Sequence, residues 1–488
     1  VSFDYSELLQ PLLQSQSGVV NGVETVGLAL LHTIGDLAKA ADELFSPTTV
    51  GSAVADPGVA PVDPSTPAAD PLTPTAQTAL IMGPTGQPIP SADYLSDVSQ
   101  RYLPADVSPQ PVFIPAGSNP LTGVQSLPFD VSVAEGVSNL NQAVLQQVAR
   151  GDHVTVFGDG QSATIASLAM QQLANGTAGP GGTASTPVSP DQLSFVLAGD
   201  PDAPNGGLLE RFYGLDSTSL GIPFYGATPP DTPYATDIYT IEYDGFSDFP
   251  RYPLNLLADL NAVAGMAYLH DTYPTADVAD AIPLGASDST QYFLIPQDEL
   301  PLLDPLRSIP VLGNPLADLL QPDLKVLVNL GYGADDVGYS TPADVATPIG
   351  LFPDVNPVTV LTELVTGAEQ GFHDAVSDIM PGTSADSLVS SPASLSTSLT
   401  DIGTALQNVV QVAYNTLFPT ADTINTLLTS VPAYDLELIQ DNLANPLDAI
   451  GLPIAADMGL ITLAGGLEYE VLANAATQIG SDLSGLIP

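Results

Sequence analysis

From residue 78 to about residue 345, the chain alternates short apolar runs with longer segments of helical spacing. Between most of the runs, apolar residues recur three and four positions apart, as in "VAEGVSNLNQAVLQQVA". Four of the runs are bounded by Gly or Pro, as buried strands usually are. The runs are "ALIM", "QPVFIP", "HVTVFG", "LSFVLAG" and "DIYTIEY". This alternation predicts an α/β domain over 78–345, with a mainly parallel sheet covered by helices.

The two flanks of this region have different patterns. Residues 1–46 place Leu, Val and Ile three and four apart, which predicts two short amphipathic N-terminal helices. Residues 47–77 are rich in Pro, Ala and Asp and are expected to form an extended linker. Residues 346–488 carry Leu, Val, Thr, Ser and Ala at helical spacing and predict a mostly α-helical C-terminal region. Because their apolar faces need cover, we expect both terminal regions to pack on the core or on each other.

Composition narrows the classes of partner. The chain has 488 residues, of which 44% are hydrophobic, so it can bury a sizeable core. Its 55 acidic and 7 basic residues give a formal net charge of -48, which repels phosphate backbones and argues against a nucleic-acid partner. There is no cysteine and there are only four histidines, so we expect no disulfide, no metal site and no cofactor. The apolar stretch "IGLPIAADMGLITLAGGL" is interrupted by Pro453 and Asp457, and predicts a packed helix rather than a membrane span.

The stretch "HVTVFGDGQSATIASLAM" places a serine where a buried strand turns into a helix. The pentapeptide Gly160-Gln161-Ser162-Ala163-Thr164 has the spacing of G-x-S-x-G, with Thr in the last position. In that motif a nucleophilic serine sits on a tight strand-to-helix turn, next to free backbone N–H groups. Ser162 is therefore a candidate nucleophile, and the alternative is a serine that caps the helix.

A serine nucleophile needs a histidine base and an orienting carboxylate, which follow in the order acid, then histidine, in this fold. Two histidines lie downstream, His270 and His373. His270 follows the strand "DIYTIEY" and the loop "DGFSDFP", which offers Asp244 and Asp248. His373 lies in the predicted helical region, where we expect it to be solvated. We therefore expect a His270 ring nitrogen within about 3.5 Å or one water of the Ser162 hydroxyl.

Five blocks of sequence, in order, resemble the mycobacterial PE-PPE domain, a cutinase-like serine α/β-hydrolase, over residues 78–345. The blocks are "ALIMGPTGQPIPSADYLSDVSQRYL", "VTVFGDGQSATIAS", "GDPDAPNGGLLERF", "YDGFSDFPRYPLNLLADLNAVAGMAYLHDTYP" and "YFLIPQDELPLLDPLRSIPVLGNPLADLLQPDLKVLVNLGYG". The resemblance implies an esterase, or an acyltransferase that builds acylated trehalose and related lipids, secreted or held in the cell envelope. Its substrate would be a lipid or an acylated glycolipid.

The resemblance also assigns roles to residues. It implies Ser162 as the nucleophile and His270 as the base. It implies Asp248 as the acid, with Asp244 as the alternative. For the oxyanion hole it implies Thr85, in "MGPTG", and the backbone N–H of Ala163.

Two questions stay open at the level of sequence. The same acyl-enzyme can be released to water or to a sugar or lipid hydroxyl, so hydrolysis and acyl transfer are both compatible with the motifs. The second question is whether the chain catalyses a reaction at all, because a structural or lipid-binding envelope protein could have the same hydrolase fold without activity. Apolar terminal helices also allow peripheral contact with the envelope, and a homo-oligomer. Convergence of Ser162, Asp248 and His270 would favour turnover.

Overall fold

The computed structural model describes residues 77–484, apart from 120, 124–125, 288, 310–312, 334–336 and 380–398. The predicted N-terminal helices, and all but the end of the predicted linker, lie outside these residues.

A seven-stranded sheet forms the centre of the described chain, in the order β2-β1-β3-β4-β7-β9-β8. All neighbouring strands pair in parallel except β8, which is antiparallel to β9 at one edge. The strands are β1 (Gln77–Ile81), β2 (Ser108–Pro111), β3 (His153–Asp159), β4 (Leu193–Ala198), β7 (Ala235–Ile241), β8 (Ile282–Ala286) and β9 (Thr290–Ile295), with a separate small pair of β5 (Asp216–Ser217) and β6 (Ile222–Pro223). The prediction of a mainly parallel sheet is confirmed.

Helices of different lengths join these strands and continue beyond them. The α-helices are α2 (Ala92–Tyr102), α3 (Phe129–Val148), α4 (Gln161–Asn175), α5 (Leu208–Arg211), α6 (Leu256–Tyr268), α7 (Asp304–Arg307), α8 (Gly313–Asn329), α9 (Pro357–Ile379), α10 (Leu399–Asp441) and α11 (Pro446–Ser484). Short 3₁₀ turns are η1 (Pro180–Gly182), η2 (Pro190–Gln192), η3 (His270–Thr275), η4 (Val278–Asp280) and η5 (Pro301–Leu303).

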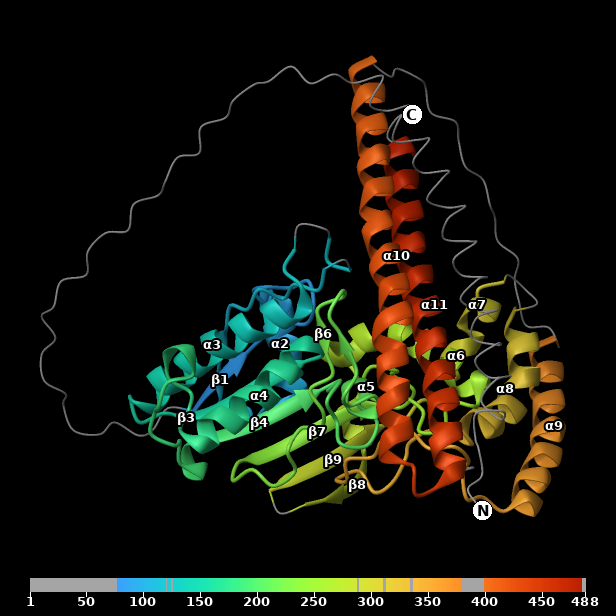
Figure 1. Ribbon diagram of the computed structural model, residues 1–488, viewed down its shortest axis with the longest axis horizontal. Coiled ribbons are helices and arrows are strands. Elements are labelled where there is room, and N and C mark those ends of the chain that lie inside the picture. The colour runs from blue at the N-terminus through green and yellow to red at the C-terminus, as the bar shows by residue number, and fades with distance from the viewer. Residues whose placement is uncertain are drawn as a thin grey trace, which may run out of the picture. The chain divides into compact units, whose positions relative to one another are not determined.

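Each face of the sheet is covered by its own helices (Figure 1). On one face, alternate strand residues such as Val156 and Leu197 pack against apolar side chains of α3 and α4. On the other face, the intervening residues such as Phe157 and Val196 pack against α2 and Tyr273 of η3. Because strand residues point alternately to the two faces, near-continuous apolar runs are what a sheet buried on both sides requires.

One strand lies earlier than the apolar pattern predicted. The run "QPVFIP" was expected to be a strand, but β2 covers "SPQP", Ser108–Pro111. In the described sheet, β2 is an edge strand that pairs only with β1. Its other side has no neighbouring strand there, so a proline whose missing N–H would point that way costs no hydrogen bond of the sheet. The sheet edge thus accepts two prolines that would be costly in a central strand.

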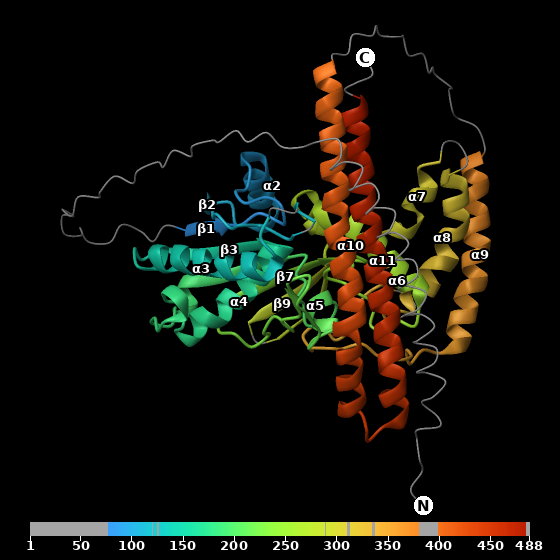
Figure 2. The ribbon, with the colours of Figure 1, turned by 45° about the horizontal axis from the view of Figure 1, so that its top comes forward.

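The C-terminal region is helical, as predicted. α8 packs against α9, and α10 packs against α11, and the two views agree on both pairs (Figures 1 and 2). Side chains of α10 and α11 such as Tyr434 and Leu460 share a buried cluster with Phe212 and Phe249 of the α/β region. This part of the expected terminal packing is therefore confirmed. Within the described residues, Pro446–Tyr469 of α11 is the one helix long and apolar enough to cross a membrane by length and composition.

Candidate active site

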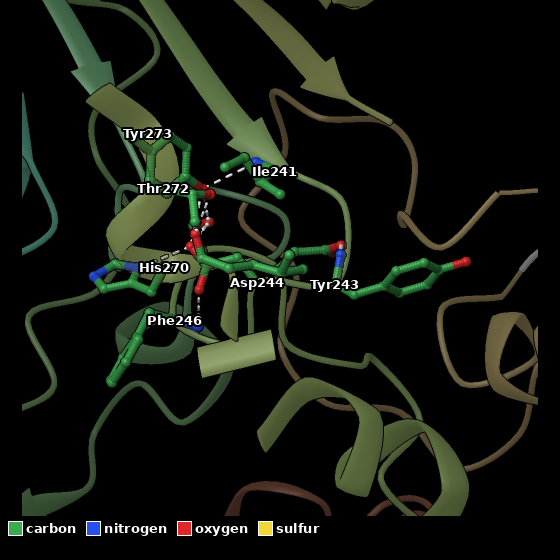
Figure 3. Close-up of polar contacts among 10 residues, drawn as sticks. Ile241, Tyr243, Asp244, Phe246, His270, Thr272 and Tyr273 are labelled. Atoms are coloured by element: carbon green, nitrogen blue, oxygen red, sulfur yellow. Dashed lines mark hydrogen bonds and ion pairs between the residues drawn. The ribbon is translucent and has the colours of Figure 1, made fainter. Parts of the chain in front are cut away.

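His270 and Asp244 form a buried pair at the carboxyl end of the sheet. His270 begins η3, and Asp244 lies three residues after the end of β7. Nδ1 of His270 lies 2.9 Å from Oδ2 of Asp244, whose side chain has no exposed surface (Figure 3). The two residues are far apart in sequence, and they meet because the loops after parallel strands gather at one edge of the sheet.

Three further groups hold the Asp244 carboxylate in place (Figure 3). The Ser247 hydroxyl donates to Oδ2 at 2.8 Å, and the Tyr273 hydroxyl donates to the same oxygen at 2.9 Å. The backbone N–H of Phe246 donates to Oδ1 at 3.2 Å. The Phe246 ring also lies beside the imidazole, with ring centroids 4.5 Å apart. The orientation of His270 is therefore fixed by both a carboxylate and an aromatic neighbour.

The imidazole of His270 is easier to protonate than a free histidine. Burial is the largest single influence and lowers the pKa of His270, but the charge and hydrogen bond of Asp244 act against it. With the charges of Asp159 and Asp271, they raise the pKa to about 9. His270 is therefore an imidazolium at neutral pH and becomes a free base in alkaline solution.

The sharp turn between β3 and α4 is centred on Gly160. β3 ends at Asp159 and α4 begins at Gln161, so Gly160 alone makes the turn, with φ 57° and ψ -117°. Residues 158 and 162 flank this turn, and their backbones lie close together. A Cβ on Gly158 would lie 2.4 Å from the carbonyl oxygen of Ser162, so residue 158 must be small. A Cβ on Gly160 would lie 2.7 Å from Nε2 of His270. The position that faces the histidine is therefore 160.

Ser162 lies within the first turn of α4, and its hydroxyl has other partners. The side chain is fully buried. Its Oγ accepts a hydrogen bond from the N–H of Asp159 at 2.7 Å and donates to the carbonyl oxygen of Asp159 at 3.0 Å. Among the described residues these are its hydrogen bonds, and none joins it to His270. The geometry differs from the expected serine–histidine contact, and it is not a helix cap either, because the N-cap of α4 is Gly160 and no side chain caps the helix.

Asp248 does not contact the histidine, which corrects the preferred choice of acid. Its side chain is buried, and Oδ2 accepts the N–H of Tyr243 at 2.8 Å. Burial also raises the pKa of Asp248 well above its usual range. The loop makes a helical turn after Asp244, in which the N–H of Asp248 donates to the carbonyl of Asp244. The Asp248 carboxylate therefore bonds to the backbone of Tyr243 and not to the imidazole. The alternative acid, Asp244, is the residue that the structure brings to His270.

The two residues expected in the oxyanion hole lie in different situations. The N–H of Ala163 donates to the carbonyl of Gly160 at 2.9 Å, so it is already used. Thr85 is exposed in the turn after β1. The N–H groups of Gln161 and Ser162, which open α4, have no partner among the described residues. Free N–H groups at a helix start can stabilise a developing oxyanion.

Asp159 is a further buried carboxyl group that the sequence reasoning did not select. Its Oδ2 accepts the Tyr94 hydroxyl at 3.0 Å, while Oδ1 has no partner within the described chain. Burial raises the pKa of Asp159 to about 7, and the nearby charge of His270 offsets part of that rise. The residue precedes Gly160, so the second position of the Gly-Asp-Gly turn could have drawn attention to it.

His373 lies on α9 with 85% of its side chain exposed, as its sequence context predicted. In the described ranges, no group of three His, Asp or Glu side chains is arranged to hold a metal ion.

A model of the PE-PPE domain matches residues 105–333. The esterase PE16 of Mycobacterium tuberculosis is 39% identical over 429 residues, covering 83% of this chain and 78% of PE16. This chain belongs to the PE-PPE domain family. The family's uncharacterized PPE28 of the same organism is 43% identical and covers 85% of this chain and 68% of PPE28. A more distant relative, the diacyltrehalose acyltransferase Chp2 of the same organism, is 29% identical over 57% of this chain and 79% of Chp2.

Proposed function

We propose that this chain binds acyl lipid esters beside His270 and does not form an acyl-enzyme on serine. The observation that carries this proposal is Gly160, which occupies the turn position facing Nε2 of His270. A glycine has no hydroxyl for the imidazole to deprotonate, so the first step of serine catalysis has no nucleophile there.

The choice of ligand rests on the family. Relatives of this chain are named as an esterase and as acyltransferases for diacyltrehalose and SL1278. This chain has a mainly parallel sheet covered by helices and a histidine–aspartate pair at the carboxyl end of that sheet. A lipid ester is therefore the ligand class that we propose. The cell-envelope location, the domain limits and the oligomeric state expected from the resemblance remain predictions.

Ser162 is poorly placed to act as the nucleophile in place of residue 160. Its hydroxyl is buried and forms hydrogen bonds with both the backbone N–H and the backbone carbonyl of Asp159. Nucleophilic attack by Ser162 would require breaking both bonds. Its position two residues after the turn is that of the flanking small residue, packed against Gly158.

A serine-directed fluorophosphonate with a long alkyl chain tests the proposal on the full chain. We expect no covalent labelling of the native protein. We expect Gly160→Ser to gain His270-dependent labelling, and Gly160→Ala, which adds the Cβ without a hydroxyl, to remain unlabelled. The gain requires the imidazole to withdraw from 2.7 Å toward an ordinary contact of at least 3.4 Å, and residue 160 to keep its φ of 57° with a side chain present.

Binding is measured separately by calorimetry with a long-chain ketone, an ester analogue that cannot be hydrolysed. We expect saturable binding by the native chain. Covalent labelling of Ser162 in the native protein, or no binding of the ketone, would overturn the proposed function.

A further inference from the structure

We propose that the His270–Asp244 pair activates a water molecule for direct attack on the bound ester, in place of a serine hydroxyl. The inference rests on the proposed function, since it needs an ester bound beside Gly160. It assigns to the site a one-step hydrolysis in which no covalent enzyme species forms.

Nε2 of His270 is free and open to solvent. Nδ1 is engaged by Asp244 at 2.9 Å, while Nε2 has no hydrogen-bond partner among the described residues. Nε2 is also not one of the buried unpaired atoms of those residues, and 15% of the side chain is exposed, so solvent reaches the ring. Figure 3 shows the second ring nitrogen pointing away from the carboxylate.

The groups that orient His270 as a general base are all in place. Asp244 is positioned by Ser247, Tyr273 and the Phe246 N–H, and it fixes the tautomer in which Nε2 of the neutral ring accepts a proton. A positioned base of this kind contributes about 10²- to 10⁴-fold to a rate, whatever hydroxyl it serves.

The reaction balances with water alone. Nε2 of neutral His270 takes a proton from water as the water oxygen bonds to the ester carbonyl carbon, and the carbonyl electrons move to its oxygen. The free N–H groups of Gln161 and Ser162 open the helix next to Gly160 and can stabilise that charge. The carbonyl then re-forms, the bond to the alcohol oxygen breaks, and the leaving oxygen takes the proton from Nε2. Ester and water become acid and alcohol.

The charges around the site favour release of the acid. Carboxylates approach His270 from three elements, namely Asp159 at the end of β3, Asp244 in the loop after β7 and Asp271 in η3. Tyr273 of η3 also faces Asp244 and the imidazole. Once the imidazole is neutral, in alkaline solution, a newly formed fatty carboxylate is repelled by this set, whereas a neutral ester is not. The site is thus better suited to hydrolysing esters than to retaining the fatty acid product.

The test measures hydrolysis of 4-nitrophenyl octanoate by the full chain at about pH 9, the pKa of His270. We expect steady turnover without a burst and without inhibition by the fluorophosphonate. His270→Gln should lower the rate by about 100-fold, the scale of one lost general base. The matched control His373→Gln changes an exposed histidine on α9 and should leave the rate unchanged.

A second pair of variants separates a loss of catalysis from a loss of folded protein. Asp244→Asn and Asp248→Asn each alter a buried carboxylate of the same loop, but only Asp244 contacts His270. We expect a rate loss for Asp244→Asn and none for Asp248→Asn when both are assayed below their unfolding temperatures. Equal rates for the native chain, His270→Gln and Asp244→Asn would overturn the inference while ketone binding still supported the proposed function. A burst and fluorophosphonate inhibition would overturn both.

Discussion

Gly160 carries a hydrogen atom where a side chain would face His270, and the proposed function rests on that difference. In a serine triad the histidine, the carboxylate and the hydroxyl act as a unit, and loss of the hydroxyl alone removes most of the rate. Residual catalysis of about 10³- to 10⁴-fold over water survives such losses in serine proteases, through binding and the oxyanion hole. Because that residual rate comes from binding and the oxyanion hole, the proposed slow hydrolysis does not require a serine hydroxyl.

The pKa of His270 can be measured directly. We expect its ring protons to titrate near pH 9 by NMR, because the charge and hydrogen bond of Asp244, together with the charges of Asp159 and Asp271, outweigh burial. Asp244→Asn should lower the pKa of His270 by at least about one unit, since the neutral amide no longer stabilises the imidazolium. Asp248→Asn, the matched control, should leave the pKa nearly unchanged. Titration of the native ring near 6.5 would contradict the ion pair.

The same shift links the free energy of unfolding to pH. The pKa of His270 is higher in the folded chain than in the unfolded chain, so its contribution is complete below about pH 6.5 and disappears as pH rises through about 9. We expect the difference in unfolding free energy between the native chain and His270→Gln to shrink by on the order of 2 to 3 kcal/mol across that range. Urea unfolding at several pH values measures it, and a constant difference would contradict the shift.

At the scale of elements, the turn from β3 into α4 depends on close contact between the two backbones. A Cβ on Gly158 would lie 2.4 Å from the carbonyl oxygen of Ser162 and 2.8 Å from the N–H nitrogen of Ala163. Neither atom belongs to a flexible side chain, so the strand or the helix would have to move. The hydrogen bonds of the Ser162 hydroxyl to Asp159 hold the same turn from within.

Gly158→Ala should therefore destabilise the fold by about 1 to 3 kcal/mol or more, the usual cost of forcing an extra carbon into a packed site. The measurement is the urea midpoint at constant slope. Gly465→Ala in α11 is the control, because no atom lies within 4 Å of the added Cβ. That change should be neutral or stabilise the fold by up to about 1 kcal/mol, since alanine favours a helix interior. Similar effects of both substitutions would contradict the packing argument.

At the scale of the whole molecule, the net charge of -48 makes self-repulsion a general destabilising force. Raising the salt concentration shortens the screening length from about 30 Å at 0.01 M to about 8 Å at 0.15 M. We expect the unfolding temperature to rise by several degrees over this range, measured by calorimetry at pH 7. Sodium chloride and choline chloride at equal ionic strength should act alike, and a falling unfolding temperature would contradict the expectation.

The sequence by itself determined the layered α/β architecture, because an apolar run buried on both faces is a local property that needs no distant partner. It also selected His270 over His373 and narrowed the acid to two aspartates of one loop. Only the tertiary structure decided that Asp244 contacts the histidine, because the choice depends on how the chain turns between Asp244 and Asp248 after β7.

The position of the strand-to-helix turn was decided in the same way. Two glycines and a serine within five residues allow the motif to be read in two registers, with residue 160 or residue 162 on the turn. Composition cannot separate the registers, since both have small residues at the required spacing. The end of β3 at Asp159, the positive φ of Gly160 and the approach of His270 from a loop more than a hundred residues later select residue 160. Which side chain faces the base is a property of three-dimensional contact, and no local pattern contains it.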